Sequence, residues 1–301
     1  MGVKSKAALA IVVLLLFLGS LWLQGGLDYH WDSCIKGYNQ VNKLHHLSNN
    51  SEATALDGSV LIEVCPGQNF QVSRLLSQLL AGPTDPSDIL LEPYLASWDE
   101  LVKFMEALGP MVGLISAEIK SKTTIIRQLA GSPEDNSEAE LNPEIFPMKA
   151  APELKVSAHM PAYRSVRSMI HVELEKEMVD FQQQTDSGCR TLLRLHRALL
   201  WLKLFLEKLA DVPVTGRLRS PSDLCREAYQ KSLANHHTWF VRRAAELAFI
   251  AMPERTFFFR LVCVQDQEEL SIRLTKVVQA LDEVYNRTQI ALEEHGMLDL
   301  P

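Results

Sequence analysis

From Asn69 to the end of the chain, apolar residues recur every three or four positions, and this period limits the fold more than any other feature. Such spacing places apolar side chains on one face of a helix, as residues 72–80 illustrate. The apolar positions there are Val72, Leu75, Leu76, Leu79 and Leu80, and Gly82-Pro83 should end the helix. No alternation typical of strands continues for more than a few residues. The sequence therefore predicts an all-α domain over residues 67–301.

Further helices are expected along this domain. Ser97 can cap a helix that continues to Leu108, and Pro110 should kink or break this helix before it resumes at 111–129. Residues 131–160 are rich in proline and glutamate and are expected to form a surface loop insertion. Longer helices are then expected at 162–184, 189–210, 222–251 and 266–294, with a short aromatic segment at 253–264.

A separate apolar segment, Ala7–Leu23, precedes the helical region. It carries no charge and lies at the short end of the roughly 17–25 residues that cross a bilayer. Lys4 and Lys6 precede it, and Asp28 and Asp32 follow it. The positive-inside rule then leaves the rest of the chain in the lumen or outside the cell. We therefore expect residues 1–24 to be a signal-anchor or signal segment, and the protein to be membrane-associated through this single anchor.

Residues 25–66 show no sustained period and are expected to form a stalk or linker. Asn49 lies in an Asn-x-Ser acceptor for N-glycosylation, which a lumenal stalk would permit. Cys34 and Cys65 also lie in this part of the chain. In an oxidising compartment these two cysteines could pair, or both could be free thiols, and the sequence leaves the alternatives open.

Several functional classes find no support in the sequence. The formal net charge of −7 shows no overall bias toward nucleic acid. The five cysteines have neither a C-x-x-C pair nor metal-ligand spacing, and the chain lacks G-x-S-x-G, H-E-x-x-H and P-loop motifs. We therefore expect no enzyme, no metal, no cofactor and no nucleic-acid partner. A lipid phosphatase is the enzymatic alternative, for which Cys189 and Thr191 are the local nucleophile candidates.

Charged residues lie on helix faces that otherwise look buried. In the helix at 111–129, Glu118 and Lys122 share a face with several isoleucines and are four residues apart, so they can touch. They form either a surface ion pair beside the core or two polar anchors at the mouth of an apolar cavity.

The helix at 189–210 carries three arginines and then two aromatics on one face: Arg190, Arg194, Arg197, Trp201 and Phe205. Guanidinium groups suit the oxygens of phosphate or carboxylate. Clustered arginines repel one another unless they meet anions. Those anions could be protein carboxylates such as Glu207 and Glu227, or the phosphate of a ligand.

The segment that follows, Asn235 to Arg243, combines histidine, tryptophan and paired arginines. His237 is either a structural histidine or a ligand-binding group. Trp239 beside Arg242 and Arg243 suits a membrane-contact site, because indole favours the headgroup layer, but it could equally lie in the core.

Four stretches together resemble the glycolipid transfer protein family: EPYLASWDELVKFMEALG, GCRTLLRLHRALLWLKLFLEKL, SLANHHTWFVRRAAELAF and EEHGMLDLP. The resemblance covers nearly all of residues 67–301 and is closest to the branch that transfers ceramide-1-phosphate. It implies a two-layer helical sandwich that holds one sphingolipid in a collapsible apolar pocket. The implied partners are ceramide-1-phosphate or a related sphingolipid and a membrane surface, and the domain is expected to be monomeric.

The resemblance also implies roles for single residues. Lys122, Arg190 and Arg194 match the family's phosphate-binding residues, and His237 matches the histidine that hydrogen-bonds the ceramide amide carbonyl. The sugar-binding branch has a tryptophan at the position of Arg190, so arginine there argues for phosphate over sugar. Glu118 stands where the family has an aspartate that binds the amide N–H and hydroxyl, and its extra methylene departs from the pattern.

These features predict non-enzymatic binding of ceramide-1-phosphate and its transfer between membranes. The alternative is a membrane-tethered sensor or presenter of sphingolipid without net transfer, because an uncleaved anchor would prevent free diffusion. Members of this branch are cytosolic, so a cytosolic location is the alternative to the lumenal or extracellular one.

Overall fold

The computed structural model describes residues 64–84, 87–131, 162–212 and 217–301. The chain divides into two compact units, residues 1–61 with 65–69, and residues 62–64 with 70–301. Of the first unit, Cys65–Asn69 are described, and there the Gln68 N–H donates to the Cys65 carbonyl at 3.3 Å. The helical fold belongs to the second unit.

Helix α3 (Val72–Ala81) opens the helical unit and buries Val72, Leu75 and Leu79, as the apolar period predicted. After Gly82 the chain forms β1 (Pro83–Thr84), which pairs antiparallel with β2 (Asp88–Ile89). This two-residue ladder departs from the predicted all-α fold, although the other regular elements of the described residues are helical.

Helix α4 (Leu91–Ala107) begins earlier than predicted. The prediction that Ser97 caps this helix is wrong, because Ser97 lies inside it and its hydroxyl donates to a carbonyl of the preceding turn. The earlier start is possible since Pro93 falls in the first turn, where its missing N–H costs no hydrogen bond. The Leu91 N–H is bonded to the Arg164 carbonyl at 3.0 Å.

Helix α5 (Pro110–Gly131) follows Gly109, whose φ of +111° suits glycine, and the predicted break at Pro110 is confirmed. Helix α6 (Val166–Glu175) is shorter than the predicted 162–184. Glu177 has φ +54°, so the backbone leaves the helix at this point. The polar residues at 182–187 then offer no apolar face that could stabilise a longer helix.

Helix α7 (Gly188–Ala210) matches the prediction closely. The single helix predicted over 222–251 is wrong, because the structure has α8 (Pro221–Ser232), the 3₁₀ turn η1 (Ala234–His236) and α9 (Trp239–Ile250). His237 and Thr238 adopt extended backbone conformations between these elements. Asn, His and Thr have weaker helix propensity than Leu233 and Ala234, which precede them, so the interruption begins where helix propensity falls.

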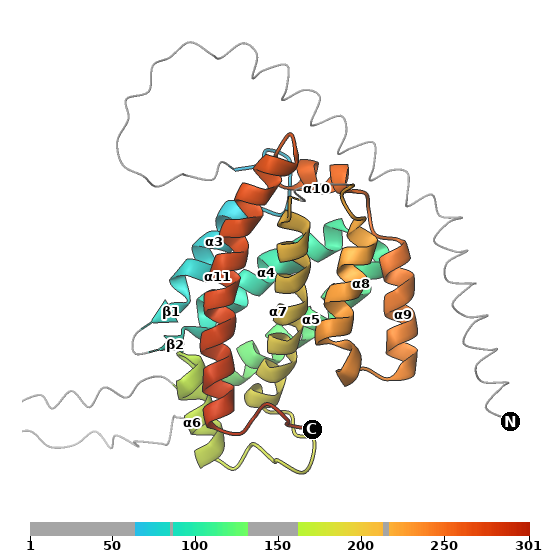
Figure 1. The fold of residues 1–301 in the computed structure, drawn as a ribbon. Helices are drawn as coiled ribbons and strands as arrows, with labels where there is room; N and C mark the ends of the chain where they lie inside the picture. Colours follow the sequence, from blue (N-terminus) through green and yellow to red (C-terminus); the bar gives the residue numbers. More distant parts are fainter. Residues whose placement is uncertain (1–63, 85–86, 132–161, 213–216) are drawn as a thin grey trace, which may run out of the picture. The chain divides into compact units, whose positions relative to one another are not determined.

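The short α10 (Arg255–Leu261) lies within the predicted aromatic segment, and α11 (Gln267–Glu294) matches the last predicted helix. Helix α11 packs along α7 and α3, and α7 also packs against α5 and α8 (Figure 1). Helices α4 and α5 lie behind α7 and α11 in this view, so these helices stack in two layers. Between them the core buries large side chains that include Trp98, Tyr94, Phe205 and Phe258.

Some predicted features lie outside the described residues. They are the apolar segment within 1–24, most of the 25–66 linker with Asn49 and Cys34, and the 131–160 insertion beyond Gly131. Among the described helices, none is long and apolar enough to cross a membrane.

The cysteines differ from the sequence expectation. Cys65 is disulfide-bonded, so the free-thiol alternative is wrong for this residue. Cys263, which the sequence analysis did not consider for pairing, is disulfide-bonded as well. Cys189 and Cys225 are buried free thiols.

Candidate functional site

The candidate site is built on the first turns of α7, whose N-terminus is fixed by a buried carboxylate. Glu173 of α6 is fully buried and accepts hydrogen bonds from the backbone N–H groups of Gly188 (2.6 Å) and Cys189 (2.8 Å). The Tyr163 hydroxyl also donates to Glu173, at 2.8 Å. A Cβ at Gly188 would lie 2.6 Å from the Glu173 carboxylate, so glycine permits this close approach. The next residue, Arg190, begins the arginine row.

Two guanidiniums of this row converge on one oxygen. Arg190 Nε donates to the main-chain carbonyl oxygen of Pro301 at 2.6 Å, and Arg194 Nη2 donates to the same oxygen at 3.3 Å. One turn further on, Arg197 Nη2 donates to the Leu298 carbonyl at 2.7 Å. The arginines therefore gather at one end of the helical unit and do not diverge into solvent.

Burial and mutual repulsion both act against the charges of the arginine row. Burial lowers the pKa of Arg194, and repulsion from Arg190 lowers it further, while Glu118 acts in the opposite direction. The pKa of Arg197 is also lowered, first by burial and then by Arg194. Main-chain oxygens bond these groups, and within the described part of the chain none of the three arginines forms an ion pair with an Asp or Glu side chain.

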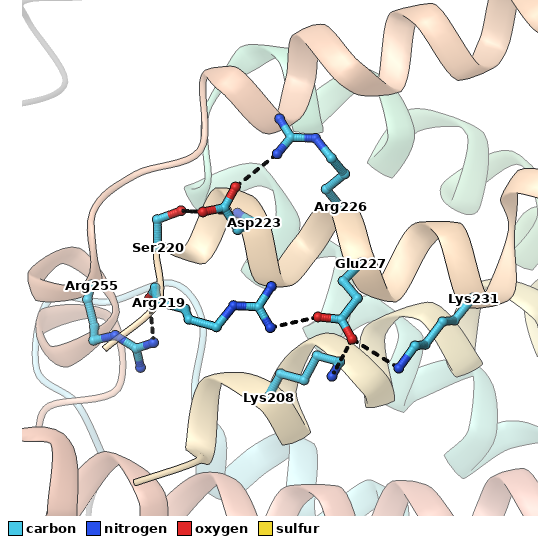
Figure 2. Close-up of polar contacts among 8 residues, drawn as sticks. All are labelled: Lys208, Arg219, Ser220, Asp223, Arg226, Glu227, Lys231 and Arg255. Atoms are coloured by element: carbon cyan, nitrogen blue, oxygen red, sulfur yellow. Dashed lines mark hydrogen bonds and ion pairs between the residues drawn. The ribbon is translucent and has the colours of Figure 1, made fainter. Parts of the chain in front are cut away.

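Glu227 does not neutralise the arginine row, so this part of the carboxylate alternative is wrong. Glu227 pairs with Lys208 at 3.0 Å, Arg219 at 2.8 Å and Lys231 at 2.9 Å, as Figure 2 shows. These three cations hold the pKa of Glu227 down at about 2. Glu207 is exposed on α7 and forms no ion pair within the described residues.

Helix α5 contributes the acid and the lysine that sequence spacing brought together. Lys122 Nζ lies 3.0 Å from a carboxylate oxygen of Glu118, and 22% of the lysine side chain is exposed against 67% of the glutamate. Helix α5 packs against α7, and Glu118 raises the pKa of Arg194, so the pair and the arginine row lie on neighbouring helices. The ion pair at the edge of the core is confirmed.

His237 lies in the segment between η1 and α9 and contacts Tyr229 of α8. Its Nδ1 lies 2.9 Å from the Tyr229 hydroxyl. Burial lowers the pKa of His237, with smaller contributions from His236 and Arg194. The imidazole is therefore neutral at pH 7, and if Tyr229 donates to Nδ1, the Nε2–H remains available as a donor.

Trp239 is exposed, so the alternative that places it in the core is wrong. Its side chain and that of Phe240 are 57% and 70% exposed, and their ring centroids lie 4.9 Å apart. The Arg243 guanidinium lies 5.6 Å from the indole centroid, within cation–π range. The start of α9 thus presents aromatic and cationic groups together at the surface.

Neither Cys189 nor Thr191, the nucleophile candidates of the enzymatic alternative, is placed to act as a nucleophile. Cys189 is fully buried, and burial followed by the nearby Glu173 raises the pKa of its thiol far above neutrality. Thr191 is buried and its hydroxyl donates to the Ser187 carbonyl at 2.8 Å. A buried thiol whose pKa is raised stays protonated at neutral pH, and a hydroxyl that donates to a main-chain carbonyl has no base to activate it. Within the described residues, no group of three or more His, Cys, Asp or Glu side chains could hold a metal ion.

Sequence reasoning missed three contributors to the site. Glu173 anchors α7 from a different helix, and no local motif signals this role. Tyr229 is a helical residue whose partner His237 lies eight positions on, beyond the reach of helical spacing. The segment 297–301 contributes backbone carbonyls, which no side-chain pattern can reveal.

Comparison with known proteins extends this description. Residues 89–264 match the family described as Glycolipid transfer protein (GLTP). A ceramide-1-phosphate transfer protein of Xenopus laevis is 39% identical over 220 residues, which covers 72% of this chain and 89% of that relative. The crystal structure of the mouse ceramide-1-phosphate transfer protein in its apo form is similar with a TM-score of 0.63 at 34% identity, covering 77% of this chain and 100% of that one.

A second solved structure has the same fold and contains lipid. The human ceramide-1-phosphate transfer protein in complex with 12:0 ceramide-1-phosphate matches with a TM-score of 0.62 at 35% identity, covering 76% of this chain and 98% of that one. The helical architecture predicted from the resemblance is therefore confirmed, and the region matched by the family includes α5, α7 and the segment that carries His237. The chain belongs to the glycolipid transfer protein family.

Proposed function

We propose that this protein binds ceramide-1-phosphate and transfers it between membranes without changing it chemically. The observation that carries the proposal is the pair Arg190 and Arg194, which point at one shared oxygen and form no ion pair with an Asp or Glu side chain of the described residues. A phosphate offers several oxygens to such a pair and brings negative charge to the clustered cations. The ceramide-1-phosphate transfer proteins to which the chain is similar support the choice of lipid.

Transfer needs shielding of the lipid chains rather than catalysis. Each methylene of a lipid chain costs about 0.8 kcal/mol to expose to water, so a two-chain lipid leaves a bilayer slowly by itself. A helical unit that covers the chains and meets the phosphate at one end lowers this barrier. Membership of a family of transfer proteins and the burial of Cys189 both support a carrier over a phosphatase.

Each candidate residue has a distinct role in the proposal. Lys122, Arg190 and Arg194 bind the phosphate oxygens. His237 donates its Nε2–H to the amide carbonyl, and the Tyr229 hydroxyl holds the ring in the required tautomer. Glu118 accepts from the amide N–H, for which it must leave Lys122 once the lysine turns to the phosphate.

A transfer assay tests the proposal. The full chain is mixed with donor vesicles that contain ceramide-1-phosphate and with acceptor vesicles, and the recovered lipid is analysed for released phosphate. We expect transfer of intact ceramide-1-phosphate and little transfer of ceramide, which lacks the phosphate. Arg190→Leu should lower the transfer rate about tenfold to a hundredfold, the range that one charged hydrogen bond represents.

Arg127→Leu is the matched control, because Arg127 lies on α5 in an exposed ion pair with Asp99. It should transfer at the unaltered rate. Equal transfer by Arg190→Leu and Arg127→Leu would contradict the proposal, and so would release of phosphate from the lipid.

We also propose that the start of α9 rests on the membrane surface, as one monomer, during lipid exchange. Trp239 and Phe240 supply exposed rings that favour the interface, and Arg242 and Arg243 supply charge that favours anionic lipid. The double variant Trp239→Ala with Phe240→Ala should bind vesicles more weakly in flotation while keeping its thermal unfolding midpoint. Ile272→Ala, which removes an exposed apolar residue of α11, is the control.

For location, we propose a domain held in the lumen or outside the cell by an uncleaved segment within residues 1–24. The flanking charges support this topology, and the disulfide-bonded Cys65 and Cys263 fit an oxidising compartment. Glycosidase treatment should then remove one glycan, at Asn49. Asn286 also begins a sequon, but its Thr288 is fully buried within α11 and bonded to the Val284 carbonyl. Resistance of the wild-type chain to glycosidase would favour the cytosolic alternative.

The transfer assay on the full chain, with its N-terminal segment, also distinguishes a carrier from a sensor. If the full chain binds ceramide-1-phosphate but moves none of it to acceptor vesicles, the protein is a membrane-tethered sensor or presenter. Net transfer by the full chain supports the carrier.

A further inference from the structure

The segment from Met297 to Pro301 crosses the arginine row in an unusual way. After α11, Gly296 adopts φ +66° and turns the chain back toward α7. Met297 is fully buried and Leu300 is 4% exposed, so two apolar side chains anchor the segment to the core. The main-chain carbonyls of Leu298 and Pro301 then accept hydrogen bonds from the arginines. We call residues 297–301 the carbonyl strap.

We propose that the carbonyl strap is a latch, in which the Pro301 carbonyl oxygen occupies the place of a lipid phosphate oxygen and is displaced when the lipid binds. The proposal rests on the proposed function, because it concerns the same phosphate site. The evidence is the position of this oxygen. Arg190 and Arg194 both donate to it, so a phosphate oxygen at the same point could bond both guanidiniums.

The exchange of partners has a favourable direction. A phosphate presents several charged oxygens, so it can bond Arg190 and Arg194 through separate oxygens, where the strap offers the two guanidiniums one shared oxygen. The phosphate can therefore replace the Pro301 oxygen. In the lipid-free protein, the strap meanwhile partly satisfies cations that would otherwise repel one another beside the core.

The strap is built to move without unfolding the helical unit. It follows the last turn of α11, and its hydrogen bonds to α7 come from side chains, so its release breaks no helical hydrogen bond. Asp299 is exposed, and it favours the charged form of Arg197, which holds the Leu298 carbonyl. This second attachment lets the strap open at Pro301 while Leu298 stays bound.

A spin label on the strap tests the latch directly. A nitroxide is attached at Asp299→Cys in the full chain, with the unsubstituted chain labelled in parallel to subtract the native cysteines. The control label is placed at Ile272→Cys, an exposed position on α11 far from the site. On saturation with short-chain ceramide-1-phosphate, the label at 299 should gain mobility, and the label at 272 should not change.

Lipid binding is measured separately, by co-migration of the lipid with the protein on gel filtration. If the lipid binds and the label at 299 stays as immobile as before, the latch is refuted and the proposed function stands. If no lipid binds, the proposed function fails and the latch fails with it.

A variant gives an independent measurement. Leu300→Ala weakens an apolar anchor of the strap without changing any charge, so the latch should open more easily. We expect it to bind ceramide-1-phosphate about threefold to tenfold more tightly, the range that one ordinary hydrogen bond represents. Leu274→Ala removes an equally buried leucine of α11 outside the strap and should leave the affinity unchanged. Unchanged or weaker binding by Leu300→Ala would overturn the latch.

Discussion

Replacement of Glu173 by glutamine should destabilise the protein more than its nearly identical shape suggests. One carboxylate oxygen accepts from the Gly188 N–H and the Tyr163 hydroxyl, and the other accepts from the Cys189 N–H. Glutamine keeps one acceptor oxygen and replaces the other by an NH₂ group. The best orientation therefore retains the first two hydrogen bonds and turns a donor toward the Cys189 N–H.

The loss in free energy of unfolding follows from the backbone N–H that is left without an acceptor. A buried backbone N–H that loses its acceptor costs about 1–3 kcal/mol. The carboxylate also lies at the N-terminus of α7, where a partly buried negative charge contributes up to about 2 kcal/mol. Because the two effects overlap, we expect Glu173→Gln to lower the free energy of unfolding by about 2–4 kcal/mol.

Urea denaturation of the full chain measures this loss. The control is Glu175→Gln on the same helix, since Glu175 is exposed and its pairing with His171 is weak. We expect the control to change the free energy of unfolding by less than about 0.5 kcal/mol. A loss below about 1 kcal/mol for Glu173→Gln would refute the idea that this carboxylate anchors α7.

Three further results are expected. The pKa of His196 falls from 6.5 to about 4 on burial, so the folded state binds fewer protons than the unfolded state between these values. Stability should therefore fall by about 3 kcal/mol as the pH drops from 6.5 to 4, and His196→Phe should flatten the pH dependence of the unfolding free energy. Tyr229→Phe frees His237 and should weaken ceramide-1-phosphate binding about twofold to tenfold in a binding titration, with little change in the unfolding midpoint. Arg194→Met removes a cation whose pKa is lowered by burial and by Arg190, so calorimetry of the lipid-free protein should show an unchanged or higher midpoint, while lipid binding is lost. A lower midpoint would mark Arg194 as a structural residue.

The helices that the sequence predicted best are those whose own period determines them. The helices α3, α7 and α11 each bury one apolar face against the core, and their ends match the predicted bounds within a few residues. The start of α4 could not be found in the same way. It depends on the Leu91 N–H bonding to the Arg164 carbonyl, a contact between distant parts of the chain.

The interruption between α8 and α9 has a similar cause. Residues 222–251 keep a helical period throughout, so the pattern alone predicts one helix. The break is stabilised by tertiary structure, in which extended His237 turns back to the Tyr229 hydroxyl. Local propensity lowers the cost of this break but does not place it.

For the candidate site, the sequence supplied the side chains and not their partners. The spacing of Arg190, Arg194 and Arg197 places them on one face of any helix that contains them. The acceptor oxygen of Pro301 lies 111 residues from Arg190 and 107 residues from Arg194, and backbone atoms leave no trace in a residue pattern. Distinguishing a ligand phosphate from a neighbouring glutamate therefore required the structure.

The arginine row itself argues for function, because it is locally unfavourable. Burial and mutual repulsion both act against the charge of Arg194, and a single glutamate in place of a neighbouring residue could relieve it. Elsewhere the chain uses such relief, since Glu227 meets three cations on α7, α8 and the segment between them. A cluster of cations that no Asp or Glu side chain of the described residues neutralises, beside a well-packed core, is expected where an anion arrives from outside.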